Sequence, residues 1–314
     1  MAGPLISICI PAYKQTDYLE RLLNSIKEQT FTDYEVIVTD DSPDDSVQGL
    51  CERYRDTFTL HYFKNNPALG SPENWNAGIR KANGQWIKMM HDDDWFSGKE
   101  SLKQFADAVV ANPQSTFFFS GFNEVDLKKG SKHPFVIDDV YLKMLQKTPL
   151  TLFKKNFIGH PSTTLIKKSE DAFYNKKLKW VVDIEFYIRY LNKYKQVTAI
   201  KEPLVNIGIN EYQITKEAFR NPVIEIPETL YFYHLLPQGS FKNIFVYDYY
   251  WRFLRNLSIR SEGDIKRYAP DVVIPPIIKS MIQVQARYPL SLLKKGVVSK
   301  SLMLYSYLTN YHKL

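Results

Sequence analysis

Short apolar runs alternate with amphipathic stretches through residues 5–119 of the chain. The apolar runs are rich in β-branched and aromatic residues and predict buried strands at 5–10, 34–39, 60–63, 86–90 and 116–119. Between them, apolar residues recur at helical spacing and predict helices at 17–29, 47–54, 75–82 and 99–111. Strands that alternate with helices are typical of an α/β fold with a mainly parallel, Rossmann-like sheet and helices on both faces.

Two of the predicted helices carry signals at their ends. Asp17 is followed three positions later by Glu20, a spacing that predicts an N-terminal cap for the first helix. Gly84 follows the stretch 75–82 and predicts the end of that helix.

Three consecutive carboxylates, Asp92, Asp93 and Asp94, directly follow the predicted strand at 86–90. Adjacent like charges repel, and burying one without a partner is costly. A hard divalent cation such as Mg²⁺ or Mn²⁺ would resolve the repulsion, since these ions take carboxylates together with substrate phosphates. The alternative is an acidic turn exposed to solvent.

Polar groups follow two further strands. The residues 11–13 come after the first strand, and Asp40 and Asp41 come after the second. In a parallel α/β sheet, ligands bind in the crevice at the carboxyl ends of the strands, so all three segments should face one cleft. Neither a Gly-x-Gly-x-x-Gly turn nor a P-loop motif is present, which leaves a metal as the partner for a diphosphate.

The composition is that of a globular protein, with 44% hydrophobic and 24% charged residues among 314. No run of 18 apolar residues suggests a transmembrane helix, and the first residues lack the features of a signal peptide. Cys9 and Cys51 are expected to be reduced structural thiols. A cytoplasmic location follows.

The positive charge is concentrated toward the C-terminal end. Residues 1–205 carry a net charge of +1 and residues 206–314 a net charge of +6, and no acidic residue occurs after Asp271. We therefore expect a catalytic domain at 1–205 and a basic, mostly helical region at 206–314. Basic residues beside apolar and tyrosine-rich turns at 288–308 favour an amphipathic helix on an anionic membrane surface. The alternatives are a helix packed on the catalytic domain and a dimer contact.

Three separated motifs carry a resemblance to a known family. The segments 8–13 and 38–42, together with 82–87 running into Asp92–Asp94, resemble the family 2 glycosyltransferases of the GT-A fold. The resemblance covers roughly residues 5–205. It implies an inverting transfer of a sugar from a nucleotide diphosphate sugar, typically a UDP-hexose or UDP-N-acetylhexosamine, with Mn²⁺ or Mg²⁺.

The resemblance also implies roles for the strand-end residues in donor binding. Pro11, Ala12 and Tyr13 would line the nucleotide site, with Tyr13 stacking on the base. Asp41 would accept a hydrogen bond from the uracil ring, and Asn76 matches an asparagine of the family near the donor.

At the third strand end, Asp93 would lie at the ribose and Asp94 would bind the metal, while Asp92 and Asp94 form the Asp-x-Asp spacing. Relatives often carry Asp at the position of His91, and the role of His91 is left open.

Relatives also carry Arg at the position of Trp75. A cation for the phosphates would then come from elsewhere, for example from Lys14 or Lys64.

On the acceptor side, the segment 156–162, which includes His160, resembles that of bacterial family members. Asp183 corresponds to the family's general base at the start of a helix, with Glu185 as the alternative. Without the resemblance, Asp183 would be read as a charge interacting with the helix dipole. His160 either touches the acceptor or is a hydrogen-bonded residue before Pro161. The segment 213–215 resembles a segment that closes over the donor.

The sequence therefore predicts a glycosyltransferase that extends a surface polysaccharide or a lipid-linked oligosaccharide. One alternative is a sugar-phosphate nucleotidyltransferase, although residues 11–13 do not form the basic loop that a triphosphate needs. The other is a non-catalytic module that binds nucleic acid or another anionic surface through the basic region. An acidic cleft would repel a phosphate backbone, and no nucleic-acid-binding motif occurs, so we expect no nucleic-acid partner.

Overall fold

The computed structural model describes residues 3–210 and 219–314, and the chain divides into two compact units. The first unit consists of residues 1–149, 157–176 and 182–213, and the second of residues 150–156, 177–181 and 214–314. The segment 213–215, expected to close over the donor, lies outside the described residues.

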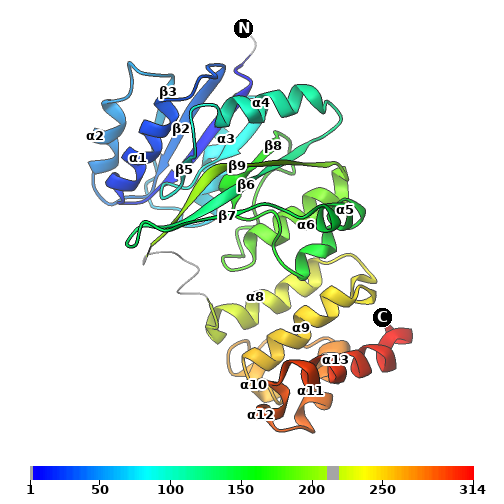
Figure 1. Ribbon diagram of the computed structural model, residues 1–314. Coiled ribbons are helices and arrows are strands. Elements are labelled where there is room, and N and C mark those ends of the chain that lie inside the picture. Colours follow the sequence, from blue (N-terminus) through cyan, green and yellow to red (C-terminus); the bar gives the residue numbers. More distant parts are fainter. Residues whose placement is uncertain (1–2, 211–218) are drawn as a thin grey trace. The chain divides into compact units, whose positions relative to one another are not determined.

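The first unit is built on one sheet with the strand order β3-β2-β1-β4-β8-β6-β9-β5, and β7 pairs with β6 (Figure 1). The strands β3, β2, β1 and β4 run parallel, whereas β8, β5 and β7 pair antiparallel with their neighbours. The elements are β1 (Ile6–Ala12), α1 (Thr16–Lys27), β2 (Tyr34–Asp40), α2 (Ser46–Glu52), β3 (Leu60–Lys64), α3 (Glu73–Lys81), β4 (Trp86–Met89), β5 (Trp95–Phe96), α4 (Ser101–Ala111), β6 (Phe117–Asp126), β7 (Lys132–Phe135), α5 (Asp139–Lys147), β8 (Thr164–Lys167), α6 (Val182–Tyr194) and β9 (Val197–Ile209).

The side chains of β1 point alternately to the two faces of the sheet, and helices cover both faces. Ile6, Ile8 and Ile10 share one core with the apolar positions of α1, α2 and α4. The intervening Cys9 faces α3, where a Cβ added to Gly78 would lie 3.3 Å from the Cβ of Cys9. Both faces of the strand are therefore buried, as its mostly apolar sequence predicted. The α/β fold class with helices on both faces is confirmed.

Both predicted helix-end signals were wrong in their detail. The residue at the N-cap of α1 is Gln15, and no side chain caps the helix; Asp17 lies in its first turn. The helix α3 ends at Lys81 with an extended Ala82, because the carboxylate of Glu35 binds the backbone N–H groups of residues 83 and 84. Gly84 is needed there for space, since an added Cβ would lie 2.6 Å from the backbone nitrogen of Ser7.

The second unit is helical where it is described beyond residue 219. Its helices are α8 (Pro222–Leu235), α9 (Ile244–Asn256), α10 (Glu262–Lys266), α11 (Pro276–Ala286), α12 (Leu290–Leu293) and α13 (Gly296–Asn310). The aromatic residues of α9 form its core: the indole N–H of Trp251 donates to Ser299 at 3.1 Å, and the Tyr247 hydroxyl lies 2.7 Å from Ser306. The basic C-terminal segment thus contributes α13 to the packing of its own unit.

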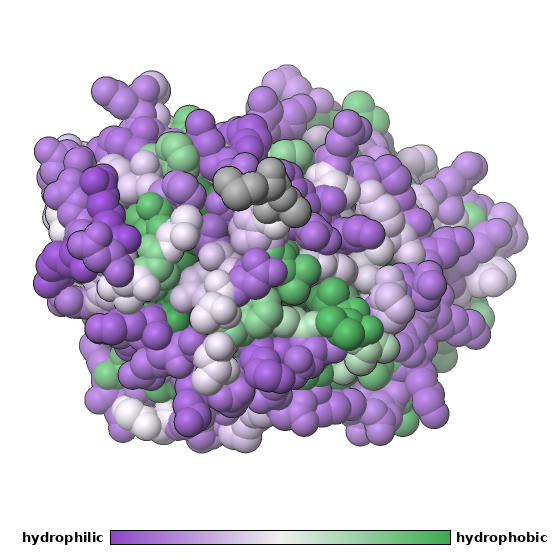
Figure 2. Space-filling model, turned by 90° about the horizontal axis from the view of Figure 1, so that it is seen from above, coloured by the Kyte–Doolittle hydropathy of each residue, from purple (hydrophilic) through white to green (hydrophobic). Residues whose placement is uncertain are grey.

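The surface and the cysteines fit the composition. The face shown in Figure 2 is mostly hydrophilic, with apolar side chains in small groups between polar ones. Within the described residues, no helix combines the length and apolarity needed to cross a membrane. Cys9 and Cys51 are both buried free thiols, as expected. Burial raises the pKa of the Cys51 thiol to about 12, so it is unreactive near neutral pH.

Candidate active site

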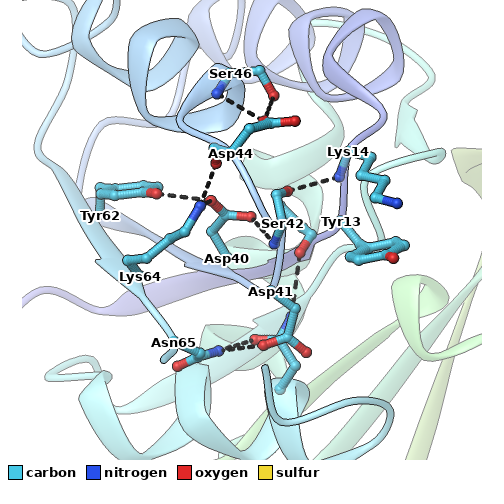
Figure 3. A network of polar contacts seen from close by, with 12 residues as sticks. Tyr13, Lys14, Asp40, Asp41, Ser42, Asp44, Ser46, Tyr62, Lys64 and Asn65 are labelled. Atoms are coloured by element: carbon cyan, nitrogen blue, oxygen red, sulfur yellow. Dashed lines mark hydrogen bonds and ion pairs between the residues drawn. The ribbon is translucent and has the colours of Figure 1, made fainter. Parts of the chain in front are cut away.

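The carboxylate of Asp40, at the end of β2, is buried and fully engaged by neighbouring groups (Figure 3). It accepts hydrogen bonds from the backbone N–H of Ser42 at 2.7 Å and from the Tyr62 hydroxyl at 2.7 Å. The ammonium group of Lys64 lies 3.1 Å from it and also contacts the Asp44 carbonyl. Lys64 is therefore held in an ion pair rather than presented to a phosphate.

Asp41 ties the loop after β3 to the end of β2 (Figure 3). Its carboxylate accepts from the side chain of Asn65 at 2.8 Å and from the backbone N–H groups of Leu69 at 3.0 Å and Gly70 at 2.7 Å. Only 7% of the residue is exposed. A carboxylate offers about four acceptor positions, so one would remain for a further donor. The assignment of Asp41 to the uracil ring stays a prediction.

The end of β1 presents an aromatic ring beside a cation. Pro11 and Ala12 complete the strand, and Tyr13, which follows, is 52% exposed. The backbone N–H of Lys14 donates to the Ser42 hydroxyl at 2.8 Å, and its ammonium group lies 4.8 Å from the centre of the Tyr13 ring. This end of the crevice thus offers an exposed aromatic face and a positive charge.

The acidic residues after β4 gather with a histidine. Ligand atoms of His91, Asp93 and Asp94 all lie within 4.8 Å of one another. The Asp92 carboxylate turns toward β1 and accepts from the Tyr13 backbone N–H at 3.3 Å. The ends of β1 and β4 therefore lie side by side, as expected for the carboxyl ends of neighbouring parallel strands.

The end of β9 holds two of these carboxylates in place. The backbone N–H of Gly208 donates to Asp94 at 3.1 Å, and the side chain of Asn210 donates to Asp93 at 2.7 Å. A Cβ at position 208 would collide with the Asp93 carbonyl, so a glycine is required there. Neither residue was expected from the sequence, because their pairing depends on the position of β9 in the sheet.

A buried lysine lies behind the acidic cluster. Lys88 is 0% exposed, and its ammonium group donates to the Ser162 carbonyl. The Ser162 hydroxyl in turn bonds Asp94 and accepts from the His91 backbone N–H at 2.9 Å. Burial lowers the Lys88 pKa to about 7, while the charge of Asp94 opposes that shift. Ser162, from the segment assigned to the acceptor side, thus supports the acidic cluster.

Burial also shifts the pKa values of the cluster itself. It raises the Asp92 pKa to about 8, with a further contribution from the charge of Asp93. The Asp94 pKa is raised well above its usual value for the same two reasons. Burial lowers the His91 pKa to about 3, so the imidazole is neutral near pH 7. The neutral imidazole is in the form that ligates metals.

The cluster fits a divalent cation. Among the described residues, no group hydrogen-bonds the buried Nε2 of His91. An unpartnered buried nitrogen is costly unless it has a ligand. Two carboxylates with one neutral imidazole form a donor set that a divalent cation would satisfy, and the carboxylates are the oxygen ligands that Mn²⁺ and Mg²⁺ favour.

An aromatic pair connects this cluster with Asp183. The Trp75 ring lies 4.6 Å from the His91 ring and meets Tyr174 edge-on at 5.0 Å. Burial raises the Tyr174 pKa, and the charge of Asp183 raises it further. Asp183 lies in the first turn of α6. The assignment of Asp183 as the general base stays a prediction.

Three other predicted site residues are held by protein partners. The Asn76 side chain is buried and bonds the Tyr174 backbone in both directions, at 2.8 and 2.9 Å. Glu185 is buried in an ion pair with Arg189 at 2.8 Å. His160 packs edge-on against Phe122, and burial lowers its pKa to about 4, so it is neutral.

Arg21 is a cation beside the cluster that the sequence analysis missed. Its guanidinium donates to the Asp93 carbonyl at 2.8 Å and lies 3.8 Å from the centre of the Trp95 ring. It sits on an ordinary amphipathic helix, and no sequence signal distinguishes it from a surface charge.

The sheet and the position of its strand-end cluster match the GT-A fold, and the family profile identifies the protein as a glycosyltransferase. The profile described as glycosyl transferase family 2 matches residues 7–172, more than half of the chain, and the chain belongs to that family. The resemblance inferred from the motifs is confirmed, and the nucleotidyltransferase alternative is wrong.

Several relatives extend beyond the matched segment. An uncharacterized glycosyltransferase of Rickettsia typhi is 24% identical over 272 residues, which cover 85% of this chain and 83% of that protein. In structure, a 1–349 fragment of Staphylococcus aureus TarS in complex with UDP-GlcNAc matches with a TM-score of 0.64 at 18% identity, covering 98% of this chain and 91% of that one. A mannosyltransferase of Pyrobaculum calidifontis in complex with GDP-Man and Mn²⁺ matches with a TM-score of 0.55 at 14% identity, covering 98% of this chain and 87% of that one.

Proposed function

We propose that this glycosyltransferase transfers a hexose or N-acetylhexosamine from a UDP sugar to a hydroxyl of a saccharide acceptor, with inversion at the anomeric carbon. The observation that carries the proposal is the meeting of three strand ends, which places Tyr13, Asp41 and the cluster at 91–94 in one unit of the fold. The complex of TarS with UDP-GlcNAc supports the choice of donor. The acceptor would belong to a surface polysaccharide or a lipid-linked oligosaccharide.

The donor is assigned along the strand ends from base to sugar. Tyr13 stacks on the uracil, Pro11 and Ala12 line its site, and Asp41 accepts from the ring. Asp92 and Asp93 lie at the ribose side. Asn76 supports the site through Tyr174, because its amide is engaged by that backbone.

Mn²⁺ or Mg²⁺ would be held by Asp94, with Asp93 and His91 as the adjacent donors. When bound, such an ion neutralises the charge of the leaving diphosphate. The Mn²⁺ complex of the mannosyltransferase supports this assignment. Ser162 and Gly208 keep Asp94 in position.

Asp183 acts as the general base. The acceptor hydroxyl oxygen forms a bond to the anomeric carbon while the bond from that carbon to the diphosphate oxygen breaks. The hydroxyl proton passes to the Asp183 carboxylate, and the nucleoside diphosphate leaves. A second carboxylate is available at Glu185 only if its ion pair with Arg189 opens. Neutral His160 is assigned to the acceptor side.

The test compares Asp183→Asn with the native enzyme on a panel of UDP sugars. The substitution should lower kcat by about 10²–10⁴-fold, the usual contribution of a general base, while UDP binding measured by calorimetry is unchanged. Native turnover by the variant would exclude Asp183 as the base.

We also propose that residues 1–205 act as the catalytic domain and that the basic region 206–314 contacts the inner face of the cell membrane. In α13 and the turn after it, Val297, Leu304, Leu308 and Tyr311 are exposed at spacings that place them on one helix face. No acidic residue lies between 272 and 314. Apolar side chains beside lysines suit anionic phospholipid.

The membrane proposal is tested by replacing Leu304 and Leu308 with serine, which leaves the buried face of α13 intact. The double variant should sediment less with vesicles containing phosphatidylglycerol, at unchanged thermal stability. Equal sedimentation, or a change of oligomeric state instead, would favour a contact between protein chains.

A further inference from the structure

Lys88 places a charge at a position of β4 that faces the hydrophobic core. Side chains of a strand alternate between the two faces of the sheet. Trp86 and Met90, two positions before and after Lys88, both belong to the core that contains Phe96 and Phe105. Lys88 is fully buried among them, and its ammonium group lies 4.8 Å from the centre of the Phe105 ring and 5.7 Å from that of Phe96. The strand pattern alone would favour an apolar residue here.

The ammonium group of Lys88 is directed to one backbone atom. Among the residues that the structure describes, it makes a single hydrogen bond, to the carbonyl oxygen of Ser162. An ammonium group has three donors, and burying a charged group is costly unless its interactions compensate. An apolar side chain in this core would avoid that cost. The lysine is therefore better explained by its effect on Ser162 than by the packing of the sheet.

Ser162 connects the short helical turn η2 (Pro161–Thr163) with the acidic cluster. It is fully buried. Its hydroxyl group accepts from the backbone N–H of His91 at 2.9 Å and bonds the carboxylate of Asp94. One hydroxyl thus joins two of the three residues whose ligand atoms lie within 4.8 Å of one another. All of these residues belong to the first unit.

Other hydrogen bonds of η2 remain within its own segment. The Thr163 hydroxyl donates to the carbonyl groups of Ile158 and His160, at 2.8 Å in both cases. Ser162, by contrast, is tied to β4 and to the residues directly after it at two points: Lys88 holds its carbonyl, and the cluster contacts its hydroxyl. A residue held at both groups has a fixed position and a fixed side-chain direction.

We propose that Lys88 is a positioning residue for the metal site: by holding the Ser162 carbonyl, it keeps the Ser162 hydroxyl between Asp94 and His91. This proposal rests on the proposed function, because it takes Asp94 and His91 as donors to the cation. Lys88 acts through Ser162, without a contact to the cation.

The charge of Lys88 by itself would have the opposite effect on a bound cation. Like charges repel, so an ammonium group near the cluster weakens Mn²⁺ binding, and its removal would tighten it. Loss of a group that orients metal ligands instead weakens metal binding about 10–100-fold. The direction of the change in Mn²⁺ affinity therefore separates a positioning role from a purely electrostatic one.

The experiment measures Mn²⁺ binding to the whole chain by calorimetry, without donor, for Lys88→Met, Ser162→Ala and the double variant. Lys88→Met replaces the ammonium group by an unbranched apolar side chain of similar length. Each single variant should raise the Kd for Mn²⁺ about tenfold. The double variant should match the single ones, because two residues that act in sequence on one ligand are not additive.

Lys168 provides a matched control in the same unit. Its ammonium group also donates to a backbone carbonyl, that of Ala82, which has no part in the cluster. Lys168→Met should leave the Kd for Mn²⁺ native. UDP binding without Mn²⁺ should be native in all of these variants, because the expected change is confined to the metal site.

A native or lower Kd in Lys88→Met would overturn the proposal. A rise of about a hundredfold in the double variant would overturn it too, because additive losses mean that the two residues act independently. If Lys88→Met does not fold or loses UDP binding, Lys88→Gln decides, since it is neutral but keeps an N–H donor. Its Kd should lie between those of the native protein and Ser162→Ala, and a native or lower Kd overturns the proposal.

Asp94→Asn is titrated in parallel to separate this proposal from the proposed function. If Asp94→Asn fails to bind Mn²⁺ while Lys88→Met binds it as the native protein does, only the positioning role fails. If the native protein itself does not bind Mn²⁺, the proposed cation fails and the positioning role with it.

Discussion

At the end of β2, Asp40 and Asp41 receive hydrogen bonds from the loop after β3, from Tyr62 and from Lys64. At the end of β4, by contrast, no group in the described part of the chain hydrogen-bonds the Nε2 atom of His91, and burial raises the pKa values of Asp92 and Asp94. Both groups lie at the carboxyl ends of parallel strands in one sheet. The first group is therefore a preformed part of the fold, whereas the second has the donor atoms that the proposed cation would use.

The largest effect is expected at Asp94. Asp94→Asn keeps the shape of the side chain and its contact with Gly208, but removes the charge that a cation requires. Turnover should fall by at least about 10³-fold, since a bound metal supplies several kcal/mol to the transition state. Far-UV circular dichroism should match the native protein. Retained metal-dependent turnover would show that Asp94 is not a ligand.

A smaller loss is expected at His91. His91→Gln removes the neutral imidazole and leaves the carboxylates, so the dissociation constant for Mn²⁺ should rise about 10–100-fold, as for the loss of a supporting ligand group. Titration of activity against Mn²⁺ measures it, and excess metal should restore turnover. An unchanged titration curve would indicate that the cation binds through carboxylates alone.

The effect of a cation on the acidic cluster at residues 91–94 should also depend on pH. The folded Asp92 pKa of about 8 lies above its ordinary value, so the stability that its neutral form gives the metal-free protein is present below about pH 4 and is lost as the pH rises through 8. The pKa of Asp94, a proposed metal ligand, is raised as well, and a bound cation would replace the proton of that carboxyl group. The increase in Tm caused by Mg²⁺ should therefore be larger at pH 8 than at pH 6, by roughly 3 °C. An equal or smaller increase at pH 8 would contradict this.

A substitution beside Asp40, at the end of β2, should lower stability rather than activity. Tyr62→Phe removes the hydroxyl that donates to Asp40 and should lower the free energy of unfolding by about 1.5 kcal/mol, the usual contribution of a hydrogen bond to a charged group. Urea unfolding measures it. Turnover and the effect of Mn²⁺ on Tm should be native; a loss of metal binding would show that the two ends are not separable.

The sequence predicted the parts that depend on local pattern. Alternating apolar runs predicted β1–β4 and their helices, and the strand-end motifs predicted the family. Partners supplied by distant segments could not be predicted: Gly208 and Asn210 reach the cluster because β9 pairs with β5, the short strand directly after it, and Arg21 reaches Asp93 from α1. Likewise, nothing in the sequence shows that the Asn76 amide is engaged by residue 174.

The most direct test of the account is calorimetric titration of UDP into the native protein and into Asp94→Asn, each with and without Mn²⁺. We predict that Mn²⁺ tightens UDP binding to the native protein at least tenfold, about 1.4 kcal/mol, and has no effect on UDP binding to the variant. Equal UDP affinity with and without Mn²⁺ in the native protein would contradict it.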